Sequence, residues 1–261
     1  MKERPSFPAR LDRPAGPAKG QPPKAVSAPA LPGQNAVVNM PAGARGVGLD
    51  SSAVRMSMVR KLEGQGIRDP RVLSAMGHVE RHRFVDTALV NQAYEDTSLP
   101  IGLGQTISKP GVVARMLDLL LDGRAGQIGR VLEIGTGCGY QAAVLSRLAG
   151  EVYSIERLRG LHDKARDNLR PLRLANLHLL FGDGMLGYPK GAPYAAIIAA
   201  AGGEAVPSAW IEQLAVGGRL IAPTLTANGQ QALVVIDKTL QGLHQQQYEA
   251  VHFVPLKSGV A

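Results

Sequence analysis

The chain has 261 residues, 45% of them hydrophobic, which is enough for one large domain or two small ones. Its single cysteine excludes an internal disulfide framework and a thiolate zinc cluster, and no apolar run approaches the roughly 18 residues that a membrane span needs. The net charge of +8 invites a nucleic-acid interpretation, but residues 1–50 alone carry 7 Lys/Arg against 3 Asp/Glu, so half of the excess lies there.

Residues 1–50 hold 9 of the 18 prolines and one aromatic residue, Phe7. Such a segment cannot bury enough apolar surface to offset the entropy of the chain, so we expect a disordered basic tail. It lacks the apolar core of a secretory signal, and we therefore expect a cytoplasmic protein. A weak tether for nucleic acid or a partner is the alternative to a solvated tail.

After Asp50 the pattern becomes helical. Ser51 is placed to cap a helix that ends near Gly64, and Asp69-Pro70 is typical of the start of a second helix. We expect a third short helix over residues 84–90. A loop rich in Gly, Pro, Thr and Ser should follow over residues 93–110.

From Val112 onward, helices and strands alternate. The expected strands are 131–134, 152–155, 177–181, 194–200 and 219–223, and the expected helices are 112–121, 140–148, 158–169 and 207–214. This alternation predicts βαβ units and a parallel sheet covered on both faces. Two final strands, 231–236 and 248–254, have no helix between them, which indicates an antiparallel edge. We therefore predict an α/β, Rossmann-like, doubly wound domain over residues 51–261, with extra N-terminal helices.

The strongest local signal is the run Glu133-Ile134-Gly135-Thr136-Gly137-Cys138-Gly139, where a strand ends and a helix starts. Its GxGxG spacing differs from the GxGxxG of dinucleotide folds. Glu133, just before the first glycine, would be awkward beside a pyrophosphate and suits a cationic group. S-adenosylmethionine offers a sulfonium and an ammonium and no phosphate, so the pattern favours this cofactor. The alternative is a tight turn that binds no ligand.

Acidic residues end the next two strands. Glu156 lies 21 residues after Gly135 and is placed to accept hydrogen bonds from both ribose hydroxyls of the cofactor. Asp183, within Gly182-Asp183-Gly184, can accept from the adenine amino group, or it marks an ordinary turn. Cys138 has no activating neighbour in sequence and is interpreted as a small filler.

Two histidines four residues apart, His78 and His82, suggest a metal site at first sight. They lack a third ligand and the HExxH pattern, so we interpret them as surface residues.

The loop before the alternating region carries a resemblance to a known family. The runs that carry it are LPIGLGQTIS (99–108), VLEIGTGCGYQAAVL (131–145), VYSIER (152–157), GDG (182–184) and EAVHFVPL (249–256). Together they resemble the protein-L-isoaspartate O-methyltransferases, and the resemblance covers about residues 52–258. The family belongs to the class I S-adenosylmethionine-dependent methyltransferases, so the resemblance implies that fold with added N-terminal helices and a modified C-terminal edge.

The resemblance implies methyl transfer to the free carboxylate of L-isoaspartyl residues in damaged proteins and peptides. The ester then collapses to a succinimide and returns in part to aspartate. It places Ser108 at the active-site serine. The residues expected to bind the cofactor are Thr106, Ile107, Glu133, Gly135, Thr136, Gly137, Glu156, Asp183 and Gly184.

The chemistry of this acceptor agrees with the residues available. A carboxylate with a pKa of about 4 is already ionised at neutral pH, so no strong general base is needed. The enzyme must position two reactants and exclude water. Ser108 would orient the carboxylate by a hydrogen bond; the alternative is that its hydroxyl caps the helix after Pro110.

Four positions depart from the family pattern: Lys109, Gly111, Ala195 and Ala200 replace a Gln, a bulky residue, an Asp and a Thr. These changes bear on substrate fit and turnover rather than on cofactor binding. Two other functions remain open: a class I methyltransferase acting on a small carboxylate or RNA, or a catalytically weakened binding module. An aromatic content of 4% argues against RNA. We expect a monomer with neither nucleic-acid nor membrane partners.

Overall fold

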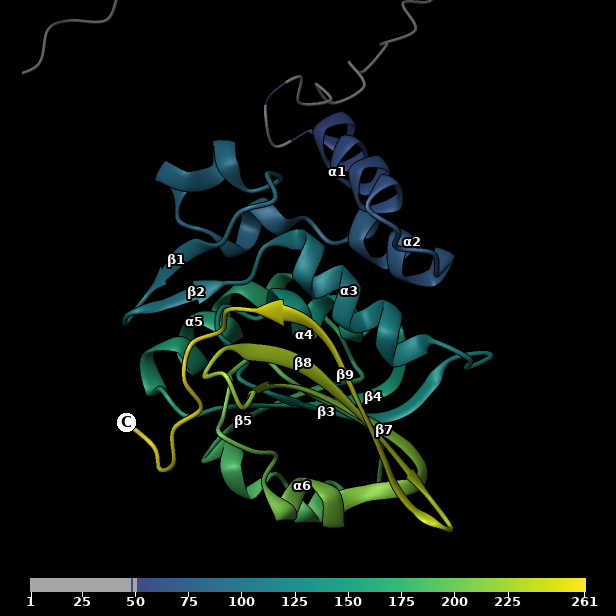
Figure 1. The fold of residues 1–261 in the computed structure, drawn as a ribbon. Helices are drawn as coiled ribbons and strands as arrows, with labels where there is room; N and C mark the ends of the chain where they lie inside the picture. Colours follow the sequence, from purple (N-terminus) through teal and green to yellow (C-terminus); the bar gives the residue numbers. More distant parts are fainter. Residues whose placement is uncertain (1–47, 49–50) are drawn as a thin grey trace, which may run out of the picture. The chain divides into compact units, whose positions relative to one another are not determined.

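A seven-stranded sheet forms the centre of the protein in the computed structural model (Figure 1). The structure describes residues 48 and 51–261, which belong to one compact unit, Ala42–Ala261. Of the segment expected to be a disordered tail, only Gly48 is described, so that prediction lies outside the described residues.

The strand order of the sheet is β5-β4-β3-β6-β7-β8-β9. The strands are β3 (Ile128–Ile134), β4 (Ala149–Glu156), β5 (Leu177–Phe181), β6 (Tyr194–Ala199), β7 (Leu214–Leu225), β8 (Gln231–Thr239) and β9 (Gly242–Val251). Neighbours from β5 through β7 are parallel, whereas β8 is antiparallel to both β7 and β9. The predicted parallel sheet with an antiparallel C-terminal edge is therefore confirmed.

Helices cover both faces of this sheet (Figure 1). On one face lie α3 (Pro110–Leu121), α4 (Tyr140–Leu145) and α5 (Arg159–Leu169), and on the other lies α6 (Ser208–Gln213). Because the central strands are buried on both faces, β6 is apolar throughout and β3 is continuously buried from Val131 to Ile134, with Glu133 as the polar residue of that stretch.

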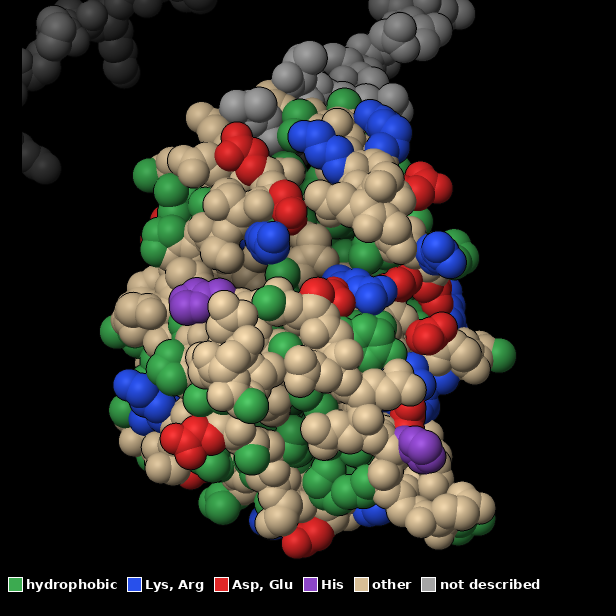
Figure 2. All heavy atoms as spheres, viewed as in Figure 1, with side chains coloured by type: hydrophobic (Ala, Val, Ile, Leu, Met, Phe, Trp, Pro, Cys, Tyr) green, Lys and Arg blue, Asp and Glu red, His purple; other side chains and the backbone are tan. Residues whose placement is uncertain are grey.

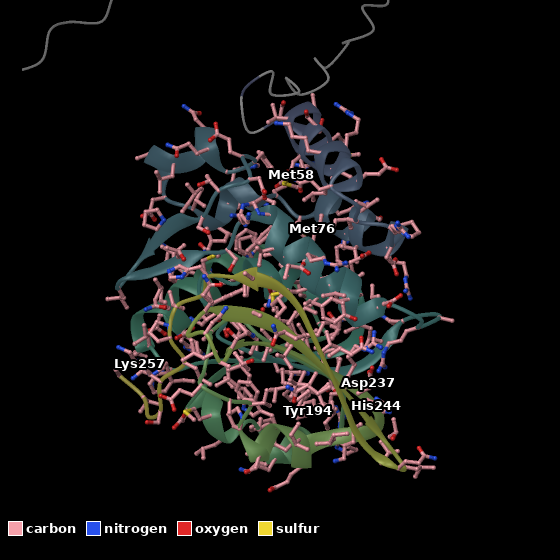
Figure 3. All side chains as sticks on the ribbon, viewed as in Figure 1. Met58, Met76, Tyr194, Asp237, His244 and Lys257 are labelled. Atoms are coloured by element: carbon pink, nitrogen blue, oxygen red, sulfur yellow. The ribbon has the colours of Figure 1, made fainter. Side chains whose placement is uncertain are left out.

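Two N-terminal helices, α1 (Ser52–Gly64) and α2 (Pro70–His78), add a further layer over α3. Met58 from α1 and Met76 from α2 are buried in the same apolar core as α3 (Figure 3). The short 3-10 helices between later elements are η3 (Arg170–Leu172), η4 (Gly184–Leu186) and η5 (Pro189–Gly191).

The region before α3 differs from its prediction in two ways. Two 3-10 helices, η1 (Arg81–Phe84) and η2 (Thr87–Gln92), replace the expected single helix. The expected loop contains an antiparallel hairpin of β1 (Leu99–Gly102) and β2 (Gln105–Ile107). The turn of this hairpin has positive φ at three successive residues, so the glycines that suggested a loop serve the hairpin turn.

The surface carries charges of both signs. On the face shown in Figure 2, acidic and basic side chains alternate over the N-terminal helices and beside the sheet edge, without a continuous basic area. None of the helices that the structure describes is long and apolar enough to span a bilayer.

Asp69 gives a testable account of how α2 begins. Its carboxylate accepts hydrogen bonds from the backbone N–H of Arg71 at 2.8 Å and from the Arg71 guanidinium, and the latter bond is the main cause that lowers the pKa of Asp69. We expect Asp69→Ala to lower the free energy of unfolding by about 1 kcal/mol at pH 7. Since a lowered pKa stabilises the folded state only above the unfolded value of about 4, the difference should shrink as pH falls below 4.

The measurement is urea unfolding of both proteins at pH 7 and pH 3.5. Asp167→Ala, which removes an exposed carboxylate from α5, serves as the control and should change the free energy by less than about 0.5 kcal/mol. A difference that stays constant down to pH 3.5 would contradict this role of the carboxylate.

Candidate active site

The strand order creates a crevice at one edge of the sheet. From β3 the chain continues to β4 on one side and later returns to β6 on the other, and ligands of doubly wound sheets bind at the carboxyl ends of the strands beside such a reversal. A cavity of about 460 Å³ lies there, lined by residues from the loops after β3, β4 and β6 and from β2. This volume is in the range of small-molecule sites.

The glycine run forms the floor of this cavity. Gly135, Gly137 and Gly139 all have positive φ, and Gly139 directly precedes α4. At Gly139 φ is +93°, and a Cβ there would lie 2.7 Å from Leu169 Cδ1, so this position favours glycine. Gly135, Thr136 and Gly137 line the cavity as the sequence predicts.

Glu156, at the end of β4, holds the glycine run in place. One carboxylate oxygen accepts the N–H of Gly137 and the other accepts the N–H of Leu158, each at 2.9 Å. Glu156 is 5% exposed and lines the cavity. Because each carboxylate oxygen has further lone pairs, the group is still able to accept hydrogen bonds from ligand hydroxyls.

Glu133 lies deeper than the sequence suggests. It is fully buried, it is not among the residues that line the cavity, and it accepts a hydrogen bond from the Ser154 hydroxyl, which also contacts the Thr136 hydroxyl at 2.6 Å. Burial raises the pKa of Glu133 to about 8, which favours the neutral acid at pH 7. One of its oxygens has no hydrogen-bond partner among the described residues. The contact of Glu133 with a cationic ligand group stays a prediction.

The Asp183 carboxylate also makes its hydrogen bonds within the protein. Its carboxylate accepts the N–H of Met185 at 2.9 Å and the N–H of Gly259 at 2.6 Å. Gly184 lines the cavity, whereas Asp183 does not. The adenine contact of Asp183 stays a prediction.

The segment of residues 106–108, which we call the acceptor loop, closes the cavity on the side of the N-terminal layer. Thr106, Ile107 and Ser108 all line it. The Ser108 hydroxyl makes no hydrogen bond within the described part of the chain, and α3 has no side-chain cap from Ser108 or Lys109. Asp96 takes that place by accepting the N–H of Gly111 at 2.7 Å. The capping alternative for Ser108 is therefore wrong, and its hydroxyl is left for a ligand.

A second, larger hollow of about 1300 Å³ meets the first at this loop. Thr106, Ser108, Ala200 and Val254 line both. A ligand in the larger hollow would thus approach a ligand in the smaller one beside Ser108. This junction is where a group could pass from a cofactor to an acceptor.

The C-terminal segment is a part of the cavity wall that the sequence reasoning missed. Val254, Pro255, Leu256 and Lys257 line the cavity, and Lys257 is labelled on this segment in Figure 3. The backbone of Gly202 pairs with Val254 and Leu256 at 2.8 Å, which fixes the segment beside the end of β6. The sequence signal that could have revealed this wall is the apolar end of the run EAVHFVPL (249–256), which was quoted above only for the family resemblance.

The structure shows what surrounds each of the four positions that depart from the family pattern. A Cβ on Gly111 would lie 2.9 Å from Asp96 Oδ1, so glycine there makes room for the carboxylate that caps α3. The same carboxylate lies 3.9 Å from Lys109 Nζ. Ala200 lines both hollows, and Ala195 packs against the core.

The remaining candidate groups make ordinary contacts. Burial raises the pKa of the Cys138 thiol to about 11, which fits a filler and not a nucleophile. His78 is exposed, and His82 contacts the Tyr94 hydroxyl at 2.7 Å. The residues described include no group of three or more potential metal ligands.

Comparison with known proteins identifies relatives of this arrangement. A protein-L-isoaspartate O-methyltransferase of Methylibium petroleiphilum is 58% identical over 98% of this chain and 96% of its own length, and one of Leptothrix cholodnii is 61% identical over 85% of this chain and 79% of its own.

Solved structures show the same fold. One protein-L-isoaspartate O-methyltransferase matches with a TM-score of 0.71 and 29% identity, over 79% of this chain and 67% of that one. A Plasmodium falciparum structure described as a putative member of the family, in complex with S-adenosyl-L-homocysteine, matches with a TM-score of 0.68 and 24% identity, over 78% of this chain and 98% of that one.

The family profile described as protein-L-isoaspartate(D-aspartate) O-methyltransferase matches residues 53–261, which include the glycine run, the acceptor loop and the C-terminal wall of the cavity. The chain therefore belongs to the protein-L-isoaspartate(D-aspartate) O-methyltransferase family.

Proposed function

We propose that Ser108 orients the acceptor carboxylate in the reaction of this enzyme, which transfers a methyl group from S-adenosylmethionine to L-isoaspartyl residues of damaged proteins. The observation that carries the proposal is the place of Ser108: its free hydroxyl lies where the smaller and the larger hollow meet. The larger hollow then takes the isoaspartyl segment of the substrate, and the smaller one takes the cofactor.

The residues of the smaller hollow fit S-adenosylmethionine. Gly135, Thr136 and Gly137 offer backbone in place of bulky side chains, and Glu156 offers carboxylate oxygens to ribose hydroxyls. Thr106, Ile107 and Gly184 complete the predicted contacts that line the cavity. We assign Glu133 an indirect role, since it contacts Ser154 and Thr136 behind the cavity wall.

The reaction requires little chemistry from the protein. When bound, S-adenosylmethionine supplies the methyl group on a positively charged sulphur. A carboxylate oxygen of the substrate attacks the methyl carbon, and the electron pair of the broken carbon–sulphur bond stays on sulphur. Because an anion and a cation neutralise each other, exclusion of water by Ile101, Ile107 and Val113 favours the transition state. A backbone amide nitrogen of the substrate then attacks the ester carbonyl, methanol leaves, and water opens the resulting succinimide in part to aspartate.

We also propose that the protein acts as a monomer in the cytoplasm, without nucleic-acid or membrane partners. The face shown in Figure 2 supports the first of these absences, because nucleic acid binds to a basic patch and this face carries mixed charges.

Paired peptides test the substrate. With labelled S-adenosylmethionine, an isoaspartyl peptide should gain label and its aspartyl twin, of otherwise identical sequence, should not. Equal labelling of both peptides would contradict the assigned substrate. Binding of the cofactor without labelling of either peptide would favour a binding module, for which Ala195 and Ala200 are the departures to examine first.

Substitution of Ser108 tests the orienting hydroxyl. Ser108→Ala should lower kcat/KM for the isoaspartyl peptide by about 10- to 100-fold, since it removes a hydrogen bond to a charged group. The Kd for S-adenosylhomocysteine should change by less than about 2-fold, because the cofactor contacts remain. Ser57→Ala, in α1, is the matched control and should change neither quantity. An unaltered kcat/KM would remove Ser108 from the mechanism.

Substitution of Glu156 tests the cofactor site. Glu156→Gln should weaken S-adenosylhomocysteine binding by about 10-fold or more in calorimetry, because it loses a charged acceptor and one tie to the glycine run. Glu151→Gln, on the same strand but paired with Arg130, should leave that Kd unchanged. Equal Kd values for Glu156→Gln and the wild type would refute the ribose contact.

A further inference from the structure

Arg81 is a buried charge that the mechanism above does not use. Its side chain is fully buried, yet it forms no ion pair with any carboxylate in the described part of the chain. Its guanidinium instead donates to two backbone carbonyls, from Nε to Ala93 and from Nη2 to Ser108, each at 2.8 Å. The third nitrogen, Nη1, has no hydrogen-bond partner among the described residues.

The same guanidinium contacts the cofactor side of the site. It lies 4.8 Å from the centre of the Tyr140 ring, and Tyr140 is the first residue of α4, directly after the glycine run. Tyr140 is itself 1% exposed and lines the smaller hollow. Arg81 therefore contacts Ser108 on one side of the site and the start of α4 on the other.

A buried guanidinium without a carboxylate partner carries a desolvation cost that an apolar side chain would not have. Burial lowers the pKa of Arg81, but arginine keeps its charge, and the two charge-assisted hydrogen bonds and the ring contact offset only part of the desolvation cost. Arg219 provides a contrast, because it also donates to backbone carbonyls, of Leu119 and Asp122, but is paired with Asp237. An apolar residue in place of Arg81 could not donate a hydrogen bond to the Ser108 carbonyl in the acceptor loop.

The backbone at Ser108 has little other support. Ser108 lies one residue beyond the last pair of the hairpin, Leu99 with Ile107, and two residues before α3. A displacement of its carbonyl would carry the hydroxyl with it. A shift of about 1 Å in a reacting group costs about 100-fold in rate.

We propose that Arg81 is a positioning residue for methyl transfer: by holding the Ser108 carbonyl against the start of α4, it sets where the Ser108 hydroxyl meets the acceptor carboxylate. This inference rests on the proposed role of Ser108 and deepens it. It concerns a residue that touches neither substrate nor cofactor and acts through the serine.

A double-mutant cycle tests the inference with Arg81→Lys, Arg81→Met, Ser108→Ala and the corresponding double variants. Active sites are counted from the stoichiometry of S-adenosylhomocysteine binding, so that a loss of folded protein does not count as a loss of rate. Lysine keeps the positive charge but cannot donate to both carbonyls as the planar guanidinium does. The lysine variant still tests the inference if the methionine variant does not fold. Arg219→Met is the control for loss of a half-buried arginine that donates to backbone carbonyls elsewhere.

We expect Arg81→Lys to lower kcat per site by about 10-fold or more in the wild-type background and by less than about 3-fold in the Ser108→Ala background, because residues that act as one unit are not additive. The Kd for S-adenosylhomocysteine should stay within about 2-fold. Arg219→Met should lower stability with kcat per site unchanged.

Three outcomes would overturn the inference in distinguishable ways. Unchanged kcat per site in both Arg81 variants means that the arginine is only structural. Equal losses in both backgrounds mean that it acts independently of Ser108. If Ser108→Ala alone has no effect, the role of the serine fails first and the inference falls with it.

Discussion

The parallel pairing of β3 with β4 on one side and β6 on the other is the constraint on which the site depends. Val131 pairs with Val152 in β4 and with Ala196 in β6, so the three strands end at one level of the sheet. The glycine run, Glu156 and Ala200 follow these ends and come together although they lie far apart in the sequence. Apolar side chains on both faces hold the strands in this register, and the polar groups that these strands contribute to the cavity wall lie where the strands end.

Two separate parts of the fold hold the two sides of the site. On the cofactor side, Glu156 ties the glycine run to the end of β4 through backbone N–H groups. On the acceptor side, the hairpin of β1 and β2 delivers Ser108 to the junction of the two hollows. The C-terminal segment lines both hollows through Val254, and it is fixed to Gly202 and, through Gly259, to Asp183. Such a site suits a reaction that depends on positioning of the reactants and exclusion of water more than on proton transfer.

Local chemistry explains which parts of this arrangement could be predicted from sequence. The glycine run is a local signal, and Glu156 follows from counting one strand further, so both are found where expected. The hairpin was missed because its glycines and Pro100 are typical of a loop, while the buried alternation of Leu99 and Ile101 is too short to stand out.

Other features depend on contacts that no local pattern marks. The position of Asp183 is decided by Gly259, which lies 76 residues further along the chain. Glu133 is turned inward by Ser154 on the neighbouring strand. The partners of Arg81 are backbone carbonyls, which every residue has, so the sequence gives no sign of them.

We propose that the methyl donor and the acceptor meet beside Ser108, and the decisive experiment is a crystal structure with S-adenosylhomocysteine and an isoaspartyl peptide bound together. We expect the sulphur in the smaller hollow beside Gly135 and the free carboxylate of the peptide in the larger hollow, within hydrogen-bond distance of Ser108 Oγ. The gap between sulphur and carboxylate should fit one methyl group. A peptide carboxylate bound away from Ser108, or a cofactor outside the hollow lined by Glu156, would contradict it.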